Sequence, residues 1–251
     1  MKKNILLGLA AGIVALFSLT AFAAPVTPDY AREKKWADEV VPGLVIGDPV
    51  YLQTPRGHHK FLTLFTPVAG TDKAVIVVHG MGIHPDWGMV GTLRTGLADR
   101  GLTTLSIQMP VLAADAKSEA YSPTFPEAAE RIAEAVSFLK AKGYARLAIV
   151  SHSMGSRMSQ VYVSGKPDSA VTSWASLGMS LDNYGKTRLP VLDLYGDNDL
   201  PAVLANAQQR KTSLKAASSR QQVILHADHF YTGREAEMVA AVADFLDATL
   251  K

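Results

Sequence analysis

The sequence predicts an α/β fold in which a mostly parallel β-sheet is covered by helices on both faces. Short apolar runs rich in Val and Ile alternate along the chain with amphipathic stretches of helical period, which is the pattern of successive strand–helix–strand units. The run Ala-Val-Ile-Val-Val within residues 73–79 is continuously apolar, as expected for a strand at the centre of a parallel sheet. With 251 residues, 48% of them hydrophobic, the chain can bury one full core of this kind.

The expected elements follow one another with short connections. Strands are expected at residues 44–53, 60–67, 73–79, 102–109, 146–150, 171–177, 190–195 and 221–226. Helices are expected at residues 87–100, 124–142, 203–216 and 232–250, with a further helix after Gly155. The first two strands should form an antiparallel hairpin around Arg56 and Gly57.

Two of these helices begin with the pattern of a capping box. Thr124 and Glu127 stand three residues apart at the start of one, and Thr232 and Glu235 at the start of the last. In such a box the threonine hydroxyl and the glutamate carboxylate bond to each other's backbone N–H groups. We therefore expect both threonines to cap their helices.

The N-terminus has the pattern of a secretory signal peptide. Lys2 and Lys3 precede an apolar run over residues 5–23, which ends in Ala-Phe-Ala at 21–23. We expect cleavage near Ala23 and a periplasmic or secreted bacterial protein; the alternative is an uncleaved membrane anchor, because the run approaches the length of a membrane span. The expected organisation is a signal peptide at 1–23, a polar leader at 24–42 and one domain at 43–251.

Charge and cysteine content exclude several classes of site and partner. The chain has 25 basic and 23 acidic residues, and removing residues 1–23 removes two lysines and no acid. The mature chain is therefore balanced and offers no argument for a nucleic-acid partner, and we expect no membrane association after cleavage. The absence of cysteine excludes a cysteine nucleophile, a thiolate metal site and a cysteine lipid anchor.

The most informative motif is Ser-His-Ser-Met-Gly at 151–155, where an expected strand passes into an expected helix. This is the form of a nucleophile elbow, G-x-S-x-G, with Ser151 in place of the first glycine. The turn would lift Ser153 out of the sheet edge, and the helix that follows would direct its N-terminal amides at a developing negative charge. His152 is expected to pack beside the turn. Ser151 adds a Cβ where the elbow is tightest.

An antiparallel start followed by parallel strand–helix units, together with this elbow, resembles the α/β-hydrolase fold over about residues 40–250. Residues 80–116 (GMGIHPDW … LSIQMPVLAADA) together with SHSMG are similar to an uncharacterised family of exported bacterial α/β hydrolases. The resemblance implies a nucleophile, an acid and a histidine in that chain order. A serine hydroxyl needs such a base and orienting acid to react at neutral pH.

The acid is expected after a late strand. By similarity to the family's G-x-x-D pattern, which begins here at Gly196, we select Asp199; Asp197 is the close rival and Asp193 the third. Either Asp197 or Asp199 could instead cap the following helix.

The base is expected in the loop between the last strand and the last helix, where the resemblance selects His229. His226, at the strand end, is expected to pack into the sheet. Asp228 is expected to shape the loop.

The resemblance also implies an oxyanion hole made of two backbone N–H groups. One is that of Met154, after the nucleophile. The other is that of Met81, in His79-Gly80-Met81-Gly82, a sequence close to an H-G-G-G loop. Gly80, Trp87 and Tyr121 are candidate substrate-binding residues, and Trp87 could equally be the first core residue of its helix.

No cofactor or metal is predicted. The spacing H-x4-H-x-D of His79, His84 and Asp86 matches no metalloprotease motif, and the G-x-G-x-x-G of dinucleotide binding does not follow the first strand. His58 and His59 lie beside the hairpin turn and are expected to be solvated.

These observations predict an exported serine hydrolase that cleaves carboxylic esters, with a small acyl compound as its ligand. Only residues 180–189 separate two late strands, so a large cap domain has no room, and short soluble esters are the expected substrates. Residues 111–123, with Tyr121, could form a partial wall. The alternatives are a non-catalytic scaffold of the same fold, which Ser151 favours, and an acyltransferase with the same three residues.

Overall fold

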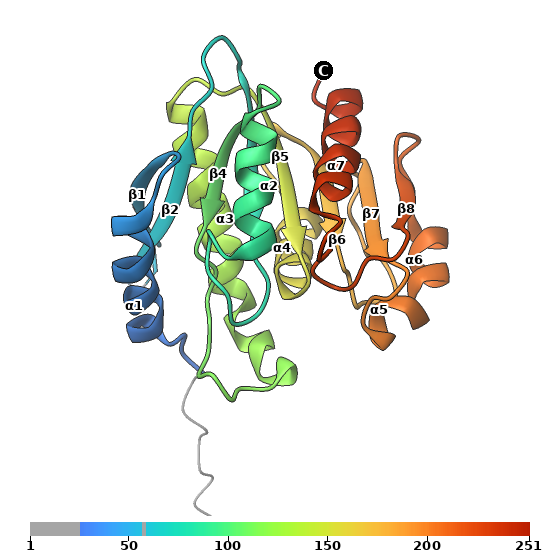
Figure 1. Cartoon of the computed structure of the whole chain (residues 1–251), viewed down its shortest axis with the longest axis horizontal. Coiled ribbons are helices and arrows are strands. Elements are labelled where there is room, and N and C mark those ends of the chain that lie inside the picture. The colour runs from blue at the N-terminus through green and yellow to red at the C-terminus, as the bar shows by residue number, and fades with distance from the viewer. Residues whose placement is uncertain (1–25, 57–58) are drawn as a thin grey trace, which may run out of the picture.

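The computed structural model describes residues 26–56 and 59–251. The expected signal peptide, the glycine of the expected hairpin turn and His58 lie outside the described residues. In the part that is described, eight strands form one sheet in the order β1-β2-β4-β3-β5-β6-β7-β8 (Figure 1). The strands are β1 Asp48–Gln53, β2 Lys60–Thr66, β3 Lys73–Val78, β4 Thr103–Ile107, β5 Arg146–His152, β6 Val171–Leu177, β7 Val191–Gly196 and β8 Arg220–Ile224.

The pairing of the strands confirms the predicted fold class. β1 pairs with β2, and β2 with β4, in antiparallel fashion. All the other pairs, from β4–β3 to β7–β8, are parallel. Parallel strands end at the same edge of a sheet, so the loops that follow β3, β5, β7 and β8 meet there.

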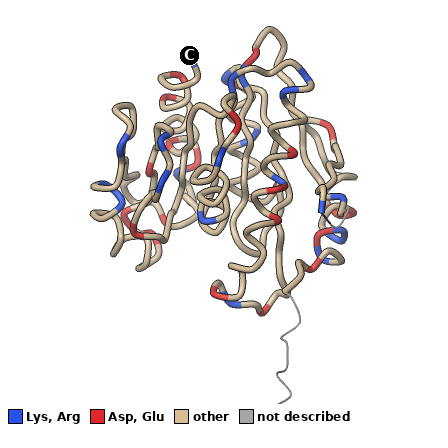
Figure 2. Tube along the Cα trace, turned by 180° about the vertical axis from the view of Figure 1, so that it is seen from behind, with Lys and Arg blue, Asp and Glu red and all other residues tan. Residues whose placement is uncertain are grey.

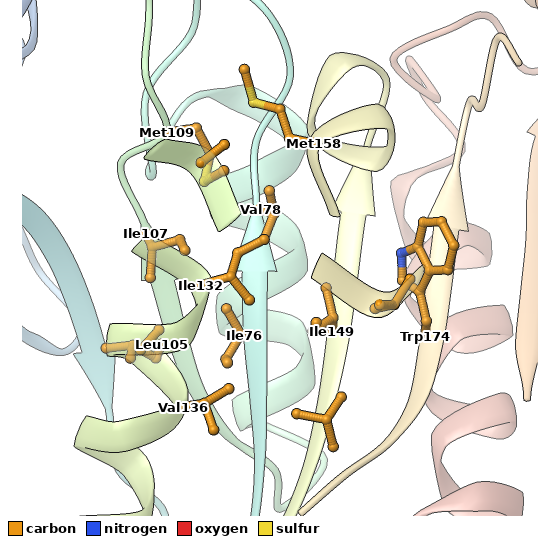
Figure 3. Close-up of a cluster of buried hydrophobic side chains, with 14 of the residues drawn as sticks. Ile76, Val78, Leu105, Ile107, Met109, Ile132, Val136, Ile149, Met158 and Trp174 are labelled. Atoms are coloured by element: carbon orange, nitrogen blue, oxygen red, sulfur yellow. The ribbon is translucent and has the colours of Figure 1, made fainter. Parts of the chain in front are cut away.

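The helices lie on both faces of this sheet. They are α1 Tyr30–Val40, α2 Gly88–Ala98, α3 Phe125–Ala141, α4 Met154–Ser164, α5 Pro201–Ala205, α6 Ala207–Ser213 and α7 Glu235–Thr249, with 3-10 turns at Val41–Gly43 and Ser118–Thr124. Apolar side chains of α3 and α4 pack on one face and those of α2 and α7 on the other. Figure 3 shows part of the first cluster, with Ile132 of α3 against Ile76 and Leu105 of the sheet.

One expected helix is divided in two. Residues 203–216 were expected to form a single helix, but α5 ends at Ala205 and α6 begins at Ala207. Between them Asn206 donates a side-chain hydrogen bond to the Ser180 carbonyl at 2.7 Å. We attribute the break to this tertiary contact, which the helical pattern of the sequence cannot predict.

Neither expected capping box forms. The Thr124 hydroxyl donates to the Tyr121 carbonyl instead, and Glu127 binds Arg131. The last helix begins at Glu235, so Thr232 precedes it, and the Thr232 N–H donates to Asp228. Other hydrogen-bond partners, before the helix or within it, compete successfully for these polar groups.

Most of the segment 24–42, which the sequence suggests is a polar leader, forms helix α1. Asp29 caps α1 by accepting from the Arg32 N–H at 3.0 Å, and the helix packs on β2. Glu33 of α1 is buried and accepts from the two terminal guanidinium nitrogens of Arg131, at 2.9 and 3.1 Å. The sequence shows α1 as polar because its buried face is narrow and carries this ion pair.

Charges are distributed without large blocks of one sign. Basic and acidic residues are interspersed over the trace (Figure 2), in agreement with the near balance of the composition. Among the residues that the structure describes, no helix is long and apolar enough to cross a bilayer.

The buried ion pair gives a test of the role of α1. Glu33→Ala leaves the fully buried Arg131 with Glu127 as its one acidic partner among the described residues, beside the Gln108 carbonyl, and should lower the free energy of unfolding by about 3 kcal/mol. Urea denaturation measures this loss. The matched control is Lys34→Ala, which breaks an exposed pair with Asp38 and should change stability by less than about 0.5 kcal/mol. Equal effects of the two variants would show that α1 does not depend on the buried pair.

Candidate active site

The candidate site lies where the loops after β3, β5, β7 and β8 meet. Ser153 follows β5, Asp199 follows β7 and His229 follows β8. The His229 Nε2 atom lies 2.9 Å from the Ser153 hydroxyl, and its Nδ1 atom lies 2.5 Å from Asp199 Oδ1. The structure thus brings the three predicted residues into one hydrogen-bonded line, with Asp199 and His229 only 5% and 7% exposed.

The elbow holds Ser153 in a backbone conformation that side-chain-bearing residues rarely adopt. Its φ is 55° and its ψ is −120°, and α4 begins at the next residue. The Ser153 N–H donates to the Leu177 carbonyl at 2.8 Å, which anchors the turn to β6. A Cβ at Gly155 would lie 2.3 Å from the His79 carbonyl oxygen. Only glycine at 155 therefore lets α4 cross β3 this closely.

The serine that departs from the elbow motif has its own partners. The Ser151 hydroxyl accepts from the Trp174 indole N–H at 2.7 Å and lies 3.1 Å from the Ser156 hydroxyl. Ser156 in turn donates to the Ser151 carbonyl at 2.9 Å. The hydroxyl thus satisfies a buried indole that a glycine would leave unpaired. The sequence motif alone gives no sign of this contact, because Trp174 lies on another strand.

The rival acids have other surroundings. Asp197 is exposed. Asp193 is fully buried, where it binds Arg210 at 3.0 Å and accepts from the Tyr184 hydroxyl at 2.6 Å. Neither hydrogen bonds to a histidine among the contacts within the described chain, whereas Asp199 does.

The loop that carries His229 is fixed by short-range contacts. Asp228 accepts from the N–H groups of Phe230 and Thr232, both at 2.9 Å, so it shapes the loop as predicted. His226 is exposed and has a φ of 61°. The expectation that it packs into the sheet is wrong, because β8 ends at Ile224.

His79 orders the loop that follows β3. Its Nε2 atom accepts from the Met109 N–H at 2.9 Å, so the ring proton is on Nδ1, which donates to the Gly80 carbonyl at 2.8 Å. Burial lowers the pKa of His79 to about 3, so the ring stays neutral. Because C=O and N–H point in opposite directions across a trans peptide, this bond turns the Met81 N–H away from His79.

The glycine of this loop lies directly against the elbow. A Cβ at Gly80 would lie 3.2 Å from the Ser153 Cβ and 3.1 Å from His152 Nδ1. The Met81 amide therefore belongs to a segment in close contact with the nucleophile turn. The other N–H group of the predicted oxyanion hole is that of Met154, which is the first residue of α4.

His152 supports the histidine loop and does not contact Ser153 through its ring nitrogens. Its Nε2 atom lies 2.8 Å from the His229 carbonyl, and the two rings lie 4.6 Å apart. Burial, and then the neighbouring His229, lower the pKa of His152 to about 4. It is a neutral packing residue, as expected from the sequence.

A small apolar cleft opens onto these groups. Its volume is 180 Å³, and it is lined by Gly80, Met81, Ile83, His152, Ser153, Leu200, His229 and Phe230. No acidic side chain, lysine or arginine is among these lining residues. A larger hollow of 570 Å³ lies between α1 and the β1–β2 hairpin, and none of the predicted site residues lines it.

Two of the candidate substrate-binding residues lie outside the cleft. Tyr121 is 1% exposed, and its hydroxyl accepts from the Leu112 N–H at 3.1 Å, so it belongs to the core. Trp87 packs against the α2 core with its ring 5.2 Å from that of Phe230. It therefore supports a cleft residue from behind. Gly80 does line the cleft.

The histidines that suggested a metal are used otherwise. His84 lies 5.8 Å from the Trp36 ring, and His59 stacks on Tyr30 and lies 3.2 Å from Glu33. His59 is therefore not the solvated residue that the sequence suggested. Among the described residues no three His, Cys, Asp or Glu side chains form a group that could hold a metal ion.

The Ser151–Trp174 contact predicts a cost of removing one hydroxyl. Ser151→Ala leaves the buried indole N–H without its acceptor and should lower the free energy of unfolding by about 1–3 kcal/mol. Thermal denaturation would detect this. Ser173→Ala is the control, because that buried hydroxyl has no partner among the described residues; it should be nearly neutral. A neutral Ser151→Ala would contradict the assigned contact.

Burial of neutral His79 predicts a dependence of stability on pH. Its pKa of about 3 lies below the ordinary 6.5, so protons bind the unfolded chain better and stability is lost as the pH falls from about 6.5 towards 3. Between pH 7 and 5 the wild type should lose about 2 kcal/mol more than His79→Gln. Urea denaturation of both proteins at pH 7 and at pH 5 measures these two losses of stability. Parallel losses would show that His79 is protonated in the folded state.

Comparisons with known proteins support the fold. Residues 51–130 match a family described as a protein of unknown function (DUF3530), and no curated protein matches the chain. A dienelactone hydrolase from Anabaena variabilis is similar in structure, with a TM-score of 0.67 and 18% identity, over 81% of this chain and 99% of that one. An α/β serine hydrolase homologue from Coxiella burnetii has a TM-score of 0.65 and 16% identity, over 81% of this chain and 99% of that one. An esterase from Pyrococcus furiosus has a TM-score of 0.65 and 14% identity, over 81% of this chain and 93% of that one. The chain therefore has the α/β-hydrolase fold, without a large cap domain.

Proposed function

We propose that this protein is an exported serine hydrolase that cleaves carboxylic esters through an acyl-enzyme. The observation that carries the proposal is the hydrogen-bonded line from Ser153 through His229 to Asp199, at the base of an apolar cleft. Nucleophile, base and orienting acid in contact form the arrangement that activates a serine hydroxyl. Export rests on the signal-peptide pattern of residues 1–23.

In the first half of the reaction, Ser153 Oγ attacks the ester carbonyl carbon while its proton passes to His229 Nε2. The carbonyl oxygen becomes an oxyanion, which the N–H groups of Met81 and Met154 would stabilise. When the intermediate collapses, the bond from carbon to the alcohol oxygen breaks, and His229 gives its proton to that oxygen. The products of this half are the free alcohol and an acyl-Ser153 ester.

In the second half, water attacks the acyl-enzyme. His229 takes one proton from the water and returns it to Ser153 Oγ, which releases the carboxylic acid and restores the enzyme. Asp199 holds the Nδ1–H of His229 throughout, so Nε2 is the atom free to accept. His229 is thereby fixed in the tautomer that the reaction needs.

The cleft supports small substrates. A volume of 180 Å³ holds about six water-sized groups, since liquid water occupies about 30 Å³ per molecule. That is enough for an ester group and a few carbons. Short acyl esters are therefore the substrates we propose.

The sequence feature that favoured a non-catalytic scaffold has a structural explanation. Ser151 fits below the elbow because Trp174 and Ser156 bind its hydroxyl, and Ser153 keeps its contact with His229. A departure from the motif at 151 is thus compatible with an assembled site. We therefore propose catalysis and not binding alone.

Replacing the nucleophile tests the proposal. Ser153→Ala should lower kcat for p-nitrophenyl acetate by at least about 10³-fold, because no acyl-enzyme can form. Ser159→Ala, six residues further along the chain and buried in α4, removes a hydroxyl with no partner among the described residues and should keep wild-type activity. If Ser153→Ala retained activity, the nucleophile assignment would be wrong.

The two neighbouring aspartates give a matched pair. Asp199→Asn should reduce kcat by about 10⁴-fold, because an amide favours the wrong histidine tautomer. Asp197→Asn, at an exposed position, should have little effect. The steady-state rates of both variants decide the assignment, and the opposite order would make Asp197 the acid.

A further inference from the structure

Three large apolar residues in the loops of the predicted site share an unusual property. Met81 lies in the predicted oxyanion loop, Leu200 follows Asp199 and Phe230 follows His229. These three large apolar side chains are 42%, 49% and 40% exposed, and all three line the cleft. Single exposed apolar residues are common, but a group of them around one cleft is typical of a binding surface.

The backbone holds at least two of these side chains in place. The Leu200 N–H donates to Asp199 Oδ1 at 2.7 Å, and the Phe230 N–H donates to Asp228 at 2.9 Å. The Phe230 ring also lies 5.2 Å from the rings of both Trp87 and His229. The exposed apolar surface is therefore built into the same loops that position the acid and the base.

The direction of proton transfer divides the cleft into two sides. In the proposed reaction the alcohol oxygen receives its proton from His229 Nε2, so the alcohol part must leave beside the loops of His229 and Asp199. Phe230 and Leu200 belong to those loops. Met81 belongs to the loop on the other side of Ser153, where the acyl oxygen would bind.

The charges around the cleft favour an uncharged alcohol. The lining of the cleft has no acidic side chain, lysine or arginine. The acidic residues of the two loops, Asp197 and Asp228, are exposed and would repel an anionic leaving group. An uncharged alcohol has no such penalty, and an apolar one gains from contact with Phe230 and Leu200.

We propose that Phe230 and Leu200 form an alcohol subsite that selects esters of uncharged, apolar alcohols. This inference rests on the proposed function and adds the substrate class. Acyl selectivity and alcohol selectivity would then reside on different sides of Ser153, with Met81 on the acyl side.

The test uses ethyl, butyl and hexyl acetate, all below their solubility limits. These alcohols differ in length but hardly in basicity, so the chemistry at the carbonyl is the same. Wild-type kcat/KM should rise about tenfold from ethyl to hexyl acetate, since fully burying each methylene is worth about fourfold and this subsite is half exposed. The acetate ester of 4-hydroxybutanoate, which is anionic, should react at least about tenfold more slowly than butyl acetate.

Variants assign the effect to the two side chains. In the double variant Phe230→Ala and Leu200→Ala, the ratio of hexyl to ethyl acetate should fall to about two. In Met81→Ala the same ratio should be retained. Val223→Ala is the control, because Val223 is 40% exposed but lies on β8 outside the cleft, and it should behave as the wild type.

Three results would overturn the alcohol subsite. A wild-type ratio near one would show that no such selectivity exists, and a tenfold ratio that survives in the double variant would place it elsewhere. A rate that rises only when hexyl acetate forms droplets would make the exposed side chains a surface for aggregated lipid. If no ester is hydrolysed at all, the proposed function itself fails, which is distinguishable from hydrolysis without alcohol selectivity.

Discussion

The close crossing of α4 over the end of β3 is the constraint on which the candidate site depends. At this point Gly155 lies so near the His79 carbonyl that any side chain at 155 would overlap it. The crossing forces the chain to turn within one residue, and Ser153 adopts a positive φ as a result. The unfavourable conformation is held by contacts of its neighbours, which is how strained residues persist at functional sites.

The same crossing brings two further parts of the site into range. It sets Gly80, and with it the Met81 amide, against the side of the elbow. On the other side, Gly178 has a φ of 60°, and a Cβ there would lie 2.8 Å from His229 Cε1. His229 can reach Ser153 only because this position has no side chain. Glycines thus allow the close approach of neighbouring segments on both sides of Ser153.

Hydrogen bonds of buried polar side chains then hold these closely packed loops in position. His79 and His152, both kept neutral by burial, bind the carbonyls of Gly80 and His229. A neutral imidazole can do this without the cost of burying a charge. The rigidity of the site therefore comes from hydrogen bonds one layer behind the residues that would react.

Local patterns in the sequence predicted most of the fold. The strands and the elbow depend on alternation, apolar runs and small residues within a few positions, and these signals are local. The choice of Asp199 and His229 came from the resemblance to the α/β-hydrolase fold, through its G-x-x-D pattern and its chain order. The break at Asn206 and the burial of Tyr121 could not be predicted, because both depend on contacts with residues outside their own elements.

The polar helix α1 was missed for a related reason. Its stability comes from Glu33 and Arg131, which are 98 positions apart, and a charged residue in a polar stretch gives no sign that it is buried. The partners of Ser151 escaped in the same way. Contacts between distant polar groups are the part of this structure that a single sequence does not reveal.

The most direct test of the central claim, an activated Ser153, is covalent labelling of the folded protein with a fluorophosphonate, followed by mass spectrometry of the peptides. Such a probe reacts with a serine only when a neighbouring base activates it. The account predicts one adduct per chain, on Ser153, and no adduct in Ser153→Ala. Folded wild-type protein that remains unlabelled, or that is labelled on another serine, would contradict it.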